Sequence, residues 1–246
     1  MADHGILFSA PMVRALLAGT KTQTRRLLSE ARVFATPETK AFTLRGDDLA
    51  RALQNASGFR RLDGNGWFWE SDAFEWQAPA LRTGWMAHIG YAPGDRLWVR
   101  EAWRTWRWND RLKPSATPAE WGRRLHDFVQ FEADNDNRMD GRLRASMHLP
   151  RAFSRLTLIV TDVRVQRLQD ISEEDARAEG IVPLPSGRFH CGFDDEGEIT
   201  SKSAITAYAW LWNAINGEDA WSANPWVVAY TFTVHQQNID AMEKAA

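Results

Sequence analysis

Apolar residues recur at helical spacing near the start of the chain and at strand spacing near its end. Between residues 10 and 18 they repeat every three or four positions, which predicts an amphipathic helix that begins after Ser9 and ends at Gly19. Within 226–234 they occupy alternate positions, the pattern of a strand with one buried face. Both ends of the chain are therefore expected to belong to the packed core.

Short strands and short helices alternate between these ends. The patterns predict strands over 96–103 and 154–168. Three acidic residues follow Ser172, and acids are stabilised at the positive end of a helix, so a helix is predicted from there to Gly180. An apolar stripe predicts a buried helix over 205–215. This succession of elements indicates an α+β fold.

Two long segments interrupt this pattern. Residues 29–92 have weak periodicity, several glycines and tryptophans two positions apart, which favours an insertion built from β-hairpins. Residues 104–145 are largely polar and form a second insertion, and 183–202, rich in Gly, Pro and acids, are expected to be a loop. We therefore expect residues 1–246 to form one domain, a small barrel-like core with flanking helices and large insertions.

Composition narrows the classes of function. The net charge of −2 is not the positive charge expected of a protein that binds long nucleic acids. A local basic site is still compatible with it. A single cysteine, Cys191, suits a reducing compartment, and no apolar run approaches the length of a membrane span. We expect a cytoplasmic monomer with no membrane partner. The 13 tryptophans suit core packing and also the stacking of bases.

Polar side chains that can take part in catalysis are most concentrated in residues 19–26, directly after the first predicted helix. Their sequence is Gly-Thr-Lys-Thr-Gln-Thr-Arg-Arg. Lys21 and Thr24 are three positions apart, so a helical or turn-like backbone would place them on one face. A lysine beside a threonine hydroxyl is a minimal base and nucleophile pair if burial lowers the pKa of the amine. The alternative interpretation is a solvated basic loop.

Metal chemistry and cofactor chemistry have little support in the sequence. His190 and Cys191 are adjacent, but no second pair stands at ligand spacing, and the other histidines are scattered. Neither a phosphate-binding loop nor a dinucleotide glycine pattern is present. We therefore expect neither a metal nor a cofactor.

Several motifs together resemble ASCH-domain proteins of the PUA-like superfamily, in the version common in phage and prophage genomes. The matching segments cover about half of the chain in order, and they are Ile6–Arg14, Gly19–Arg26, Pro93–Glu101, His148–Arg151, Ser154–Val163, Leu168–Ile181 and Asn224–Val227. The resemblance implies a PUA-like β-barrel with a cleft where helices meet the barrel. Residues 29–92 and 104–145 have no counterpart in the family.

The resemblance also implies an activity. Similar small bacterial ASCH proteins are amidohydrolases that remove the acyl group from N4-acetylcytidine, and their G-x-K-T-x-T-x-R motif falls on Lys21 and Thr24. Their catalytic glutamate falls on Glu179, late in the predicted helix. At that negative helix end a carboxylate costs about 0.3–1 kcal/mol, which is compatible with a functional role. Arg25 departs from the family, which often has an apolar residue there.

Three assignments of the chemistry remain open at this point. Thr24 attacks the acyl carbonyl while neutral Lys21 takes its proton, or Lys21 and Glu179 share one proton, or a charged Lys21 stabilises the oxyanion while Glu179 acts as the base. For recognition of the substrate we expect Arg26, Trp98 and Arg100 to contact the base, and the cleft also to involve Glu101 and His148.

Two other functions compete with this hypothesis. An ASCH-type ribonuclease would use carboxylates such as Glu101 and Glu179, although the acidic pI argues against a strong grip on RNA. A non-enzymatic module would bind RNA or a modified base without turnover, with Lys21 as a contact. The expected partner is a modified nucleoside, with RNA as the second candidate.

Overall fold

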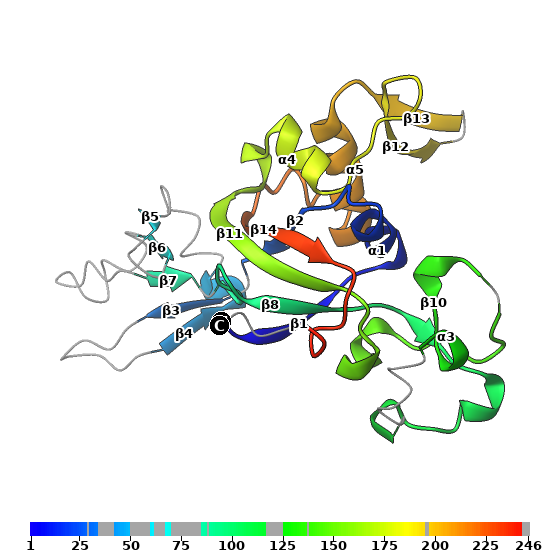
Figure 1. Ribbon diagram of the computed structural model, residues 1–246. Coiled ribbons are helices and arrows are strands. Elements are labelled where there is room, and N and C mark those ends of the chain that lie inside the picture. The colour runs from blue at the N-terminus through cyan, green and yellow to red at the C-terminus, as the bar shows by residue number, and fades with distance from the viewer. Residues whose placement is uncertain are drawn as a thin grey trace.

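The computed structural model describes residues 1–28, 30–33, 42–49, 60–61, 67–69, 85–87, 89–116, 125–136, 138–194 and 197–242. Its centre is a five-stranded sheet in the order β1-β8-β11-β14-β2 (Figure 1). These strands are β1 Asp3–Leu7, β8 Arg96–Arg100, β11 Thr157–Arg167, β14 Trp226–His235 and β2 Gln23–Leu27. β1 and β8 run parallel, and the other neighbours are antiparallel. The α+β class is confirmed, whereas closure into a barrel stays a prediction.

Helix α1 (Ala10–Leu17) packs its apolar side into the main core, against residues of this sheet. Its predicted limits are confirmed, because Ser9 is the N-cap and Gly19 turns the chain at φ +72°. The start is held by backbone, since the Val13 amide donates to the Ser9 carbonyl at 2.9 Å, while the Ser9 side chain makes no capping bond. Residues 19–26 therefore run from a helix end directly into a strand.

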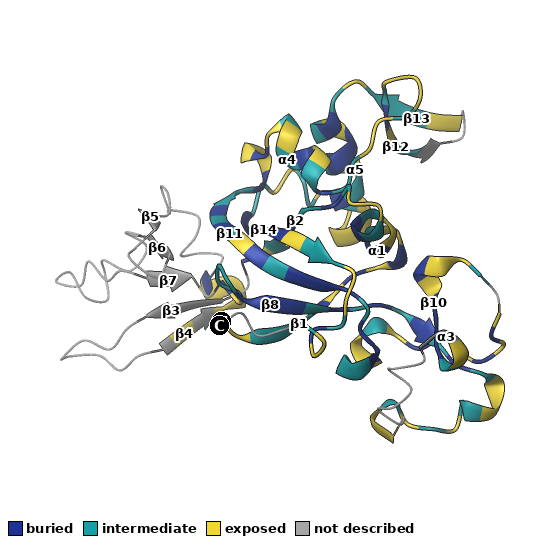
Figure 2. Cartoon of the chain, viewed as in Figure 1, coloured by how far each residue is buried: buried dark blue, intermediate teal, exposed yellow. Residues whose placement is uncertain are grey.

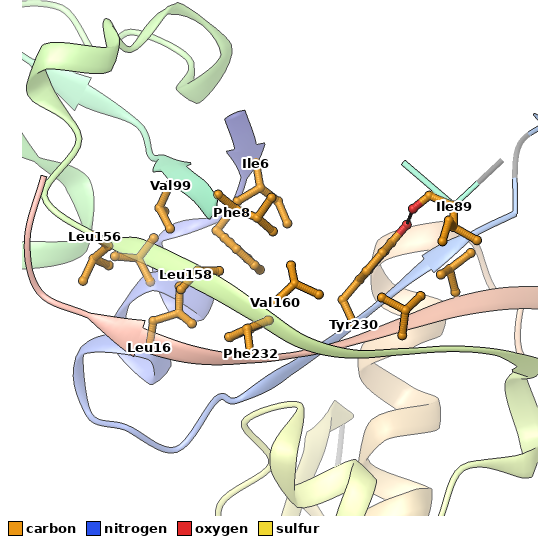
Figure 3. Close-up of a cluster of buried hydrophobic side chains, with 14 of the residues drawn as sticks. Ile6, Phe8, Leu16, Ile89, Val99, Leu156, Leu158, Val160, Tyr230 and Phe232 are labelled. Carbon is orange, nitrogen blue, oxygen red and sulfur yellow. Dashed lines mark hydrogen bonds between the residues drawn. The ribbon is translucent and has the colours of Figure 1, made fainter. Parts of the chain in front are cut away.

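The main core lies between α1 and the long antiparallel pair β11 and β14 (Figure 3). In β14 every residue from Trp226 to Tyr230 is buried, so the expectation of a half-buried strand is wrong for this part. Helices cover the second face of the strand, where Val227 joins a separate apolar cluster. Strand periodicity reports a buried face only when the other face meets water.

The covering layer consists of α4 (Glu173–Ala178) and α5 (Ala204–Asn216), which lie above the sheet in Figure 1. The Glu173 carboxylate accepts hydrogen bonds from the Ser203 hydroxyl and from the Ala204 amide, at 2.8 Å for the amide. The first turn of α4 therefore caps the N-terminus of α5. This link joins the two helices into one layer whose lower edge reaches β2.

The first insertion forms a second sheet of five short strands in the order β4-β3-β7-β6-β5. Their bounds are β3 Glu30–Val33, β4 Phe42–Arg45, β5 Arg60–Arg61, β6 Trp67–Trp69 and β7 Trp85–Ala87. All neighbouring pairs are antiparallel, as expected for hairpins, and the rest of 29–92 lies largely outside the described residues. Leu49 and Ile89 of this segment are buried in the main core, as is Leu28 directly before it, so the segment is joined to that core.

The second insertion forms a lobe near β8 that contains β9 (Trp103–Arg104), β10 (Gln130–Phe131) and α3 (Leu125–Phe128). The strand predicted over 96–103 is therefore divided, because β8 ends at Arg100. A small apolar cluster joins Val129 and Phe131 of the insertion to the flanking residues Trp103, Leu149 and Phe153, and together they form the centre of the lobe. Figure 2 shows this buried centre surrounded by exposed turns.

The expectation of a loop over 183–202 is wrong. Residues Phe189–Asp194 (β12) and Gly197–Ser201 (β13) pair as an antiparallel hairpin. Phe189 is buried against the α5 cluster, which gives the hairpin an anchor that its Gly-rich composition does not reveal.

Candidate functional site

A pocket of about 300 Å³ lies where β2, α1, α5 and the end of α4 meet. The three residues singled out as catalytic, Lys21, Thr24 and Glu179, all line it, and so does Arg26. Lys21 and Glu179 are 158 positions apart in the chain. The remaining lining residues are Met12, Arg25, Leu27, Tyr208, Leu211, Trp212, Ile215 and Asn216. The fold therefore brings together four of the eight predicted site residues.

Lys21 is buried between the turn after α1 and the end of α4, with 1% of its surface exposed. Its Nζ donates to Glu179 Oε2 at 2.8 Å and to the Glu179 carbonyl oxygen at 2.9 Å. The backbones of the two residues form a β-bridge, which fixes the amine relative to the helix end. An ammonium has three donors, so one position on the nitrogen remains for another group.

The pKa of Lys21 is lowered from its ordinary value of 10.5. Burial is the largest cause, because a charged amine loses its hydration there, and the charges of Arg26 and Arg25 act in the same direction. The Glu179 carboxylate opposes this shift through its charge and its hydrogen bond. The effect of Glu179 is smaller than that of burial. Lys21 therefore loses its proton at a lower pH than an exposed lysine does.

Glu179 is the C-cap of α4, and its side chain is 4% exposed. A carboxylate at this helix end is disfavoured by the backbone dipoles, but two cations offset the cost. Lys21 donates to one oxygen, and Arg25 Nη1 donates to the other at 3.1 Å. Gly180 follows with φ +100°, which allows the chain to turn away beside Lys21. Glu179 is thus held as an orienting group.

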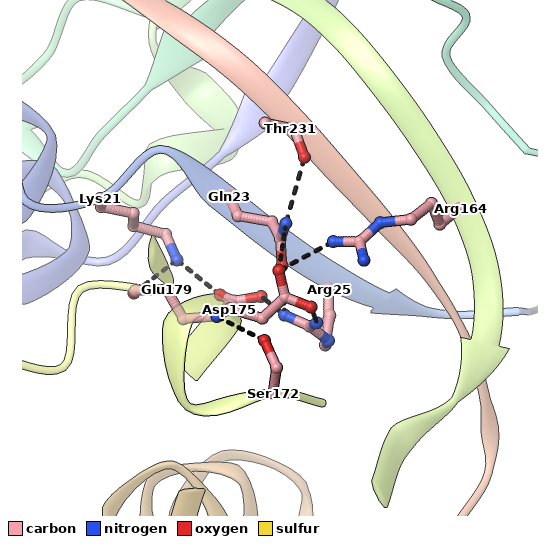
Figure 4. A network of polar contacts seen from close by, with 8 residues as sticks. All are labelled: Lys21, Gln23, Arg25, Arg164, Ser172, Asp175, Glu179 and Thr231. Carbon is pink, nitrogen blue, oxygen red and sulfur yellow. Dashed lines mark hydrogen bonds and ion pairs between the residues drawn. The ribbon is translucent and has the colours of Figure 1, made fainter. Parts of the chain in front are cut away.

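The ion pair continues into a polar network behind the pocket (Figure 4). Arg25 Nη2 donates to Asp175 Oδ2 at 3.0 Å, while Gln23 Nε2 and Arg164 Nη2 donate to Asp175 Oδ1 at 3.2 and 2.8 Å. Burial raises the pKa of Asp175, but the Arg164 hydrogen bond and the two arginine charges outweigh it, so that pKa is lowered. The carboxylate therefore stays charged and holds Arg25 in place.

The sequence pattern missed this role of Asp175. Its amide donates to Ser172 Oγ at 3.0 Å, as the predicted helix start requires, but its carboxylate is directed to β2 instead of closing a capping box. Gln23 and Arg25 are two positions apart in a strand, so they share a face. This spacing is the feature of the sequence that could have indicated a shared partner for Gln23 and Arg25. It is informative only once residues 23–27 are known to be extended.

Thr24 lies on β2 and is 3% exposed. The turn-like backbone assumed for Lys21 and Thr24 is wrong, because the chain is extended from Gln23 onward. β2 is an edge strand of the sheet, so side chains from both of its faces border the pocket. Among the described residues, no group hydrogen-bonds to the Thr24 hydroxyl, and it makes no direct bond to Lys21 Nζ.

Arg26 also lines the pocket, at the side nearest to β1. Its Nη2 donates to the Leu7 carbonyl oxygen at 2.6 Å, and its guanidinium lies 5.4 Å from the centre of the Phe8 ring. Arg26 thereby connects the two edge strands of the main sheet. Of the residues expected to contact the substrate, Arg26 is the one that lines this pocket.

Helix α5 supplies an aromatic wall that the sequence pattern assigned to the core alone. Tyr208 and Trp212 are 3% and 5% exposed, with ring centres 6.1 Å apart. Burial, assisted by the charge of Glu179, raises the pKa of Tyr208 well above its ordinary value, so the phenol stays neutral. Ile215, expected to be buried, is 56% exposed and forms the rim.

Four predicted site residues lie outside this pocket. Trp98 and Arg100 stand on β8 and pair with each other, the guanidinium 5.0 Å from the indole centre. Glu101 is 1% exposed, and Arg155 binds both of its oxygens at 2.9 Å, which indicates a structural ion pair. His148 is exposed and lines a separate hollow of the second insertion.

No group of three His, Cys, Asp or Glu side chains within the described ranges is arranged to hold a metal ion. None of the helices described is long and apolar enough to cross a membrane. Comparisons of the chain with protein-family models, with curated proteins and with solved structures find no match. The interpretation of the pocket therefore depends on its geometry and on the motif resemblance.

Proposed function

We propose that the chain is a metal-independent amidohydrolase that removes the acyl group from N4-acylated cytidine or a related modified nucleoside. The observation that carries this proposal is the meeting of Lys21, Thr24 and Glu179 in one pocket. The amine among them is buried and has a lowered pKa, which is what a lysine needs to act as a base near neutral pH.

The proposal includes a PUA-like barrel as the finer fold. The hydrogen bond from Arg26 on β2 to the Leu7 carbonyl on β1 supports it, because a side chain then spans the two edge strands of the curved sheet. A cleft at this junction, covered by α5, is where the resemblance expects the substrate. The pocket is lined by Arg26 and by residues of α5, and this position supports the proposal.

In the first half of the proposed reaction, Thr24 Oγ attacks the acyl carbonyl carbon and Lys21 Nζ accepts the hydroxyl proton. The tetrahedral intermediate then breaks its C–N bond, and the ammonium of Lys21 returns the proton to the departing exocyclic nitrogen. The products of this half are cytidine and an acyl ester on Thr24. Delocalisation into the pyrimidine ring assists the departure of the amine.

In the second half, water attacks the ester carbon while Lys21 again accepts a proton. The C–O bond to Thr24 breaks, the proton returns to the threonine oxygen, and the carboxylic acid leaves. Glu179 is the positioning residue in both halves. Each of its oxygens accepts a hydrogen bond from a cation, which favours holding Lys21 over serving as the base itself.

The walls of the pocket suit a pyrimidine. Tyr208 and Trp212 contribute the aromatic part of the lining, and the Trp212 indole N–H is buried without a hydrogen-bond partner among the described residues. Arg26 adds a cation to the lining. Stacking on an aromatic wall together with edge hydrogen bonds is the usual way in which proteins hold an isolated base.

The test is the release of cytidine from N4-acetylcytidine, followed by chromatography in the presence of a chelator. Thr24→Val removes the hydroxyl at nearly constant shape on a strand that tolerates β-branched residues, so we expect a folded protein with activity reduced at least about 1,000-fold. Thr24→Ser keeps a hydroxyl and is the matched control, with activity within about tenfold of the wild type.

Binding without turnover is the second candidate function. It is favoured by the ion pair of Lys21 with Glu179 and by the missing hydrogen bond between Lys21 and Thr24. A folded wild-type protein that binds N4-acetylcytidine in calorimetry but releases no cytidine would establish this function and refute hydrolysis. Equal activity of the Thr24→Val and Thr24→Ser variants would refute the nucleophilic role of Thr24.

A further inference from the structure

Two tryptophans of the second insertion stack on each other at the surface, remote in sequence from the pocket. Trp106 and Trp108 have ring centres 5.0 Å apart and planes only 5° from parallel. Trp108 is 72% exposed, so the ring face turned away from Trp106 is open to a ligand. An exposed indole of this size is uncommon on a protein surface and marks a candidate contact.

The loop that carries the pair is fixed by the protein interior. Arg144 is 4% exposed, and its guanidinium donates to the carbonyls of Asn109 and Leu112 at 3.0 and 2.8 Å. The Asp110 carboxylate accepts from the Arg142 amide at 3.0 Å. A buried arginine that holds two backbone carbonyls orders the loop, so the stacked rings form a rigid platform and lose little entropy on binding.

Close approach of two segments completes this support. The Gly141 amide donates to the Thr105 carbonyl at 3.1 Å, and the Arg107 amide donates to Asp140 Oδ1 at 3.0 Å. A Cβ atom at Gly141 would lie 2.1 Å from the Thr105 oxygen, so only glycine fits there. The indole N–H of Trp106 donates to the Asp127 carbonyl at 3.2 Å and fixes the inner ring.

The two segments that carry and support the platform are rich in cations, whereas the neighbouring segment 125–136 carries four acidic residues. Residues 104–116 and 138–148 contain seven Lys or Arg and two Asp. Arg144 is buried and Arg138 pairs with Asp136. The other five form no ion pair with any residue that the structure describes, and they are Arg104, Arg107, Arg111, Lys113 and Arg142.

We propose that this platform, defined by Trp106, Trp108 and those five cations, binds single-stranded nucleic acid. An aromatic face stacks any exposed base, and cations beside it neutralise the phosphates that connect the bases. A duplex hides its base faces and lacks this fit. The hollow beside the loop, about 430 Å³ and lined by Lys113, His148 and Pro150, extends the surface. This inference goes beyond the proposed hydrolysis and does not depend on it.

The test is fluorescence anisotropy of labelled single strands of about 12 nucleotides, one of RNA and one of DNA, with the full chain at about 50 mM salt. We expect binding to at least one strand, and the two arms show which sugar is preferred. Trp108→Ala is expected to weaken binding about tenfold. Trp210→Ala, at another exposed indole (45%), is the matched control and is expected to leave binding unchanged.

The cations have a separate signature. If Arg107 and Arg142 each contact a phosphate, replacing either with alanine lowers the slope of log Kd against log salt by about 0.7. Absence of binding to both strands by the folded wild type would overturn the proposal, as would equal losses in the two tryptophan variants. Equal competition by duplex would also overturn it. The oligonucleotides carry no acyl group, so these results are independent of hydrolysis.

Discussion

At the scale of single residues, the site is governed by the burial of charges. Lys21, Arg25 and Glu179 are each at most 6% exposed, and ions cost free energy to bury unless they are paired. Two cations share the Glu179 carboxylate, so neither receives its full charge. Burial is the largest cause of the lowered pKa of Lys21, and the charges of Arg26 and Arg25 act in the same direction against the opposing effect of Glu179.

The charge of Arg25 should contribute to the pH dependence of the reaction. The neutral fraction of Lys21 grows as pH rises, so kcat/KM should rise with pH and then level off. The midpoint of this rise should lie below pH 10.5. Arg25→Gln removes a cation that lowers the pKa of Lys21 and leaves Glu179 paired with the amine alone. We expect the midpoint to move to higher pH and the rate at pH 7 to fall, as measured in a pH–rate profile.

Two further variants separate this effect from general damage. Arg25→Lys keeps the charge and should keep the midpoint close to that of the wild type. Arg164→Gln removes a cation that contacts Asp175 but not Glu179, and its side chain is 39% exposed, so the midpoint should stay in place. An unchanged midpoint in a folded Arg25→Gln protein would contradict the role of Arg25.

At the scale of elements, the short helix α4 matters for where it ends. Its six residues hold little stability alone, and its position comes from Glu173, which caps α5, and from Asp175, which binds β2. Its C-terminus then places Glu179 against Lys21. The helix acts as a spacer between the aromatic wall and the edge strand.

The glycine that ends α4 is expected to be sensitive to substitution. A side chain at Gly180 would adopt φ +100°, and its Cβ would lie 3.2 Å from Ala15 Cβ and 3.4 Å from Lys21 Cβ. Gly180→Ala should lower the free energy of unfolding in urea by about 2 kcal/mol and also reduce activity, because the helix end must shift.

Gly187→Ala is the matched control for this prediction. Gly187 also has positive φ (+76°), but a Cβ atom added there would have no neighbour within 4 Å. Only backbone strain remains, so the loss in unfolding free energy should be about 1 kcal/mol with activity retained. Equal effects of the two substitutions on both measurements would show that the packing around Gly180 is unimportant.

At the scale of the whole molecule, the insertions are joined to the centre by apolar and ionic contacts. Ala133 of the second insertion lies in the main core, and Arg155 bridges Glu101 and Asp134 with bonds of 2.9 and 2.6 Å. These contacts support the expectation that residues 1–246 unfold as one domain.

Phe153→Ala tests that expectation. Phe153 is completely buried in the lobe cluster, where its ring packs edge-on against Trp103 at 5.7 Å. Its truncation should destabilise the whole chain by about 3–5 kcal/mol and move one common urea transition, seen alike in near- and far-UV circular dichroism. Leu143→Ala, at a side chain 45% exposed, should have little effect. Two separate transitions would instead make the lobe an independent unit.

The pattern of the sequence was sufficient for local features. The limits of α1 and α4, the turn at Gly19 and the long strands follow from capping residues, glycines and apolar spacing, which act over a few neighbours. The motif resemblance also selected Lys21, Thr24 and Glu179, which line one pocket. These inferences needed no knowledge of distant contacts.

Only the tertiary structure decided the features that depend on distant partners. It covered the second face of β14 with α4 and α5, directed Asp175 to Arg25, and separated Trp98, Glu101 and His148 from the pocket. Spacing along a chain cannot report which element covers a strand or which charge meets a carboxylate across 150 positions. Burial and charge pairing are properties of the packed chain, and they set the pKa of Lys21.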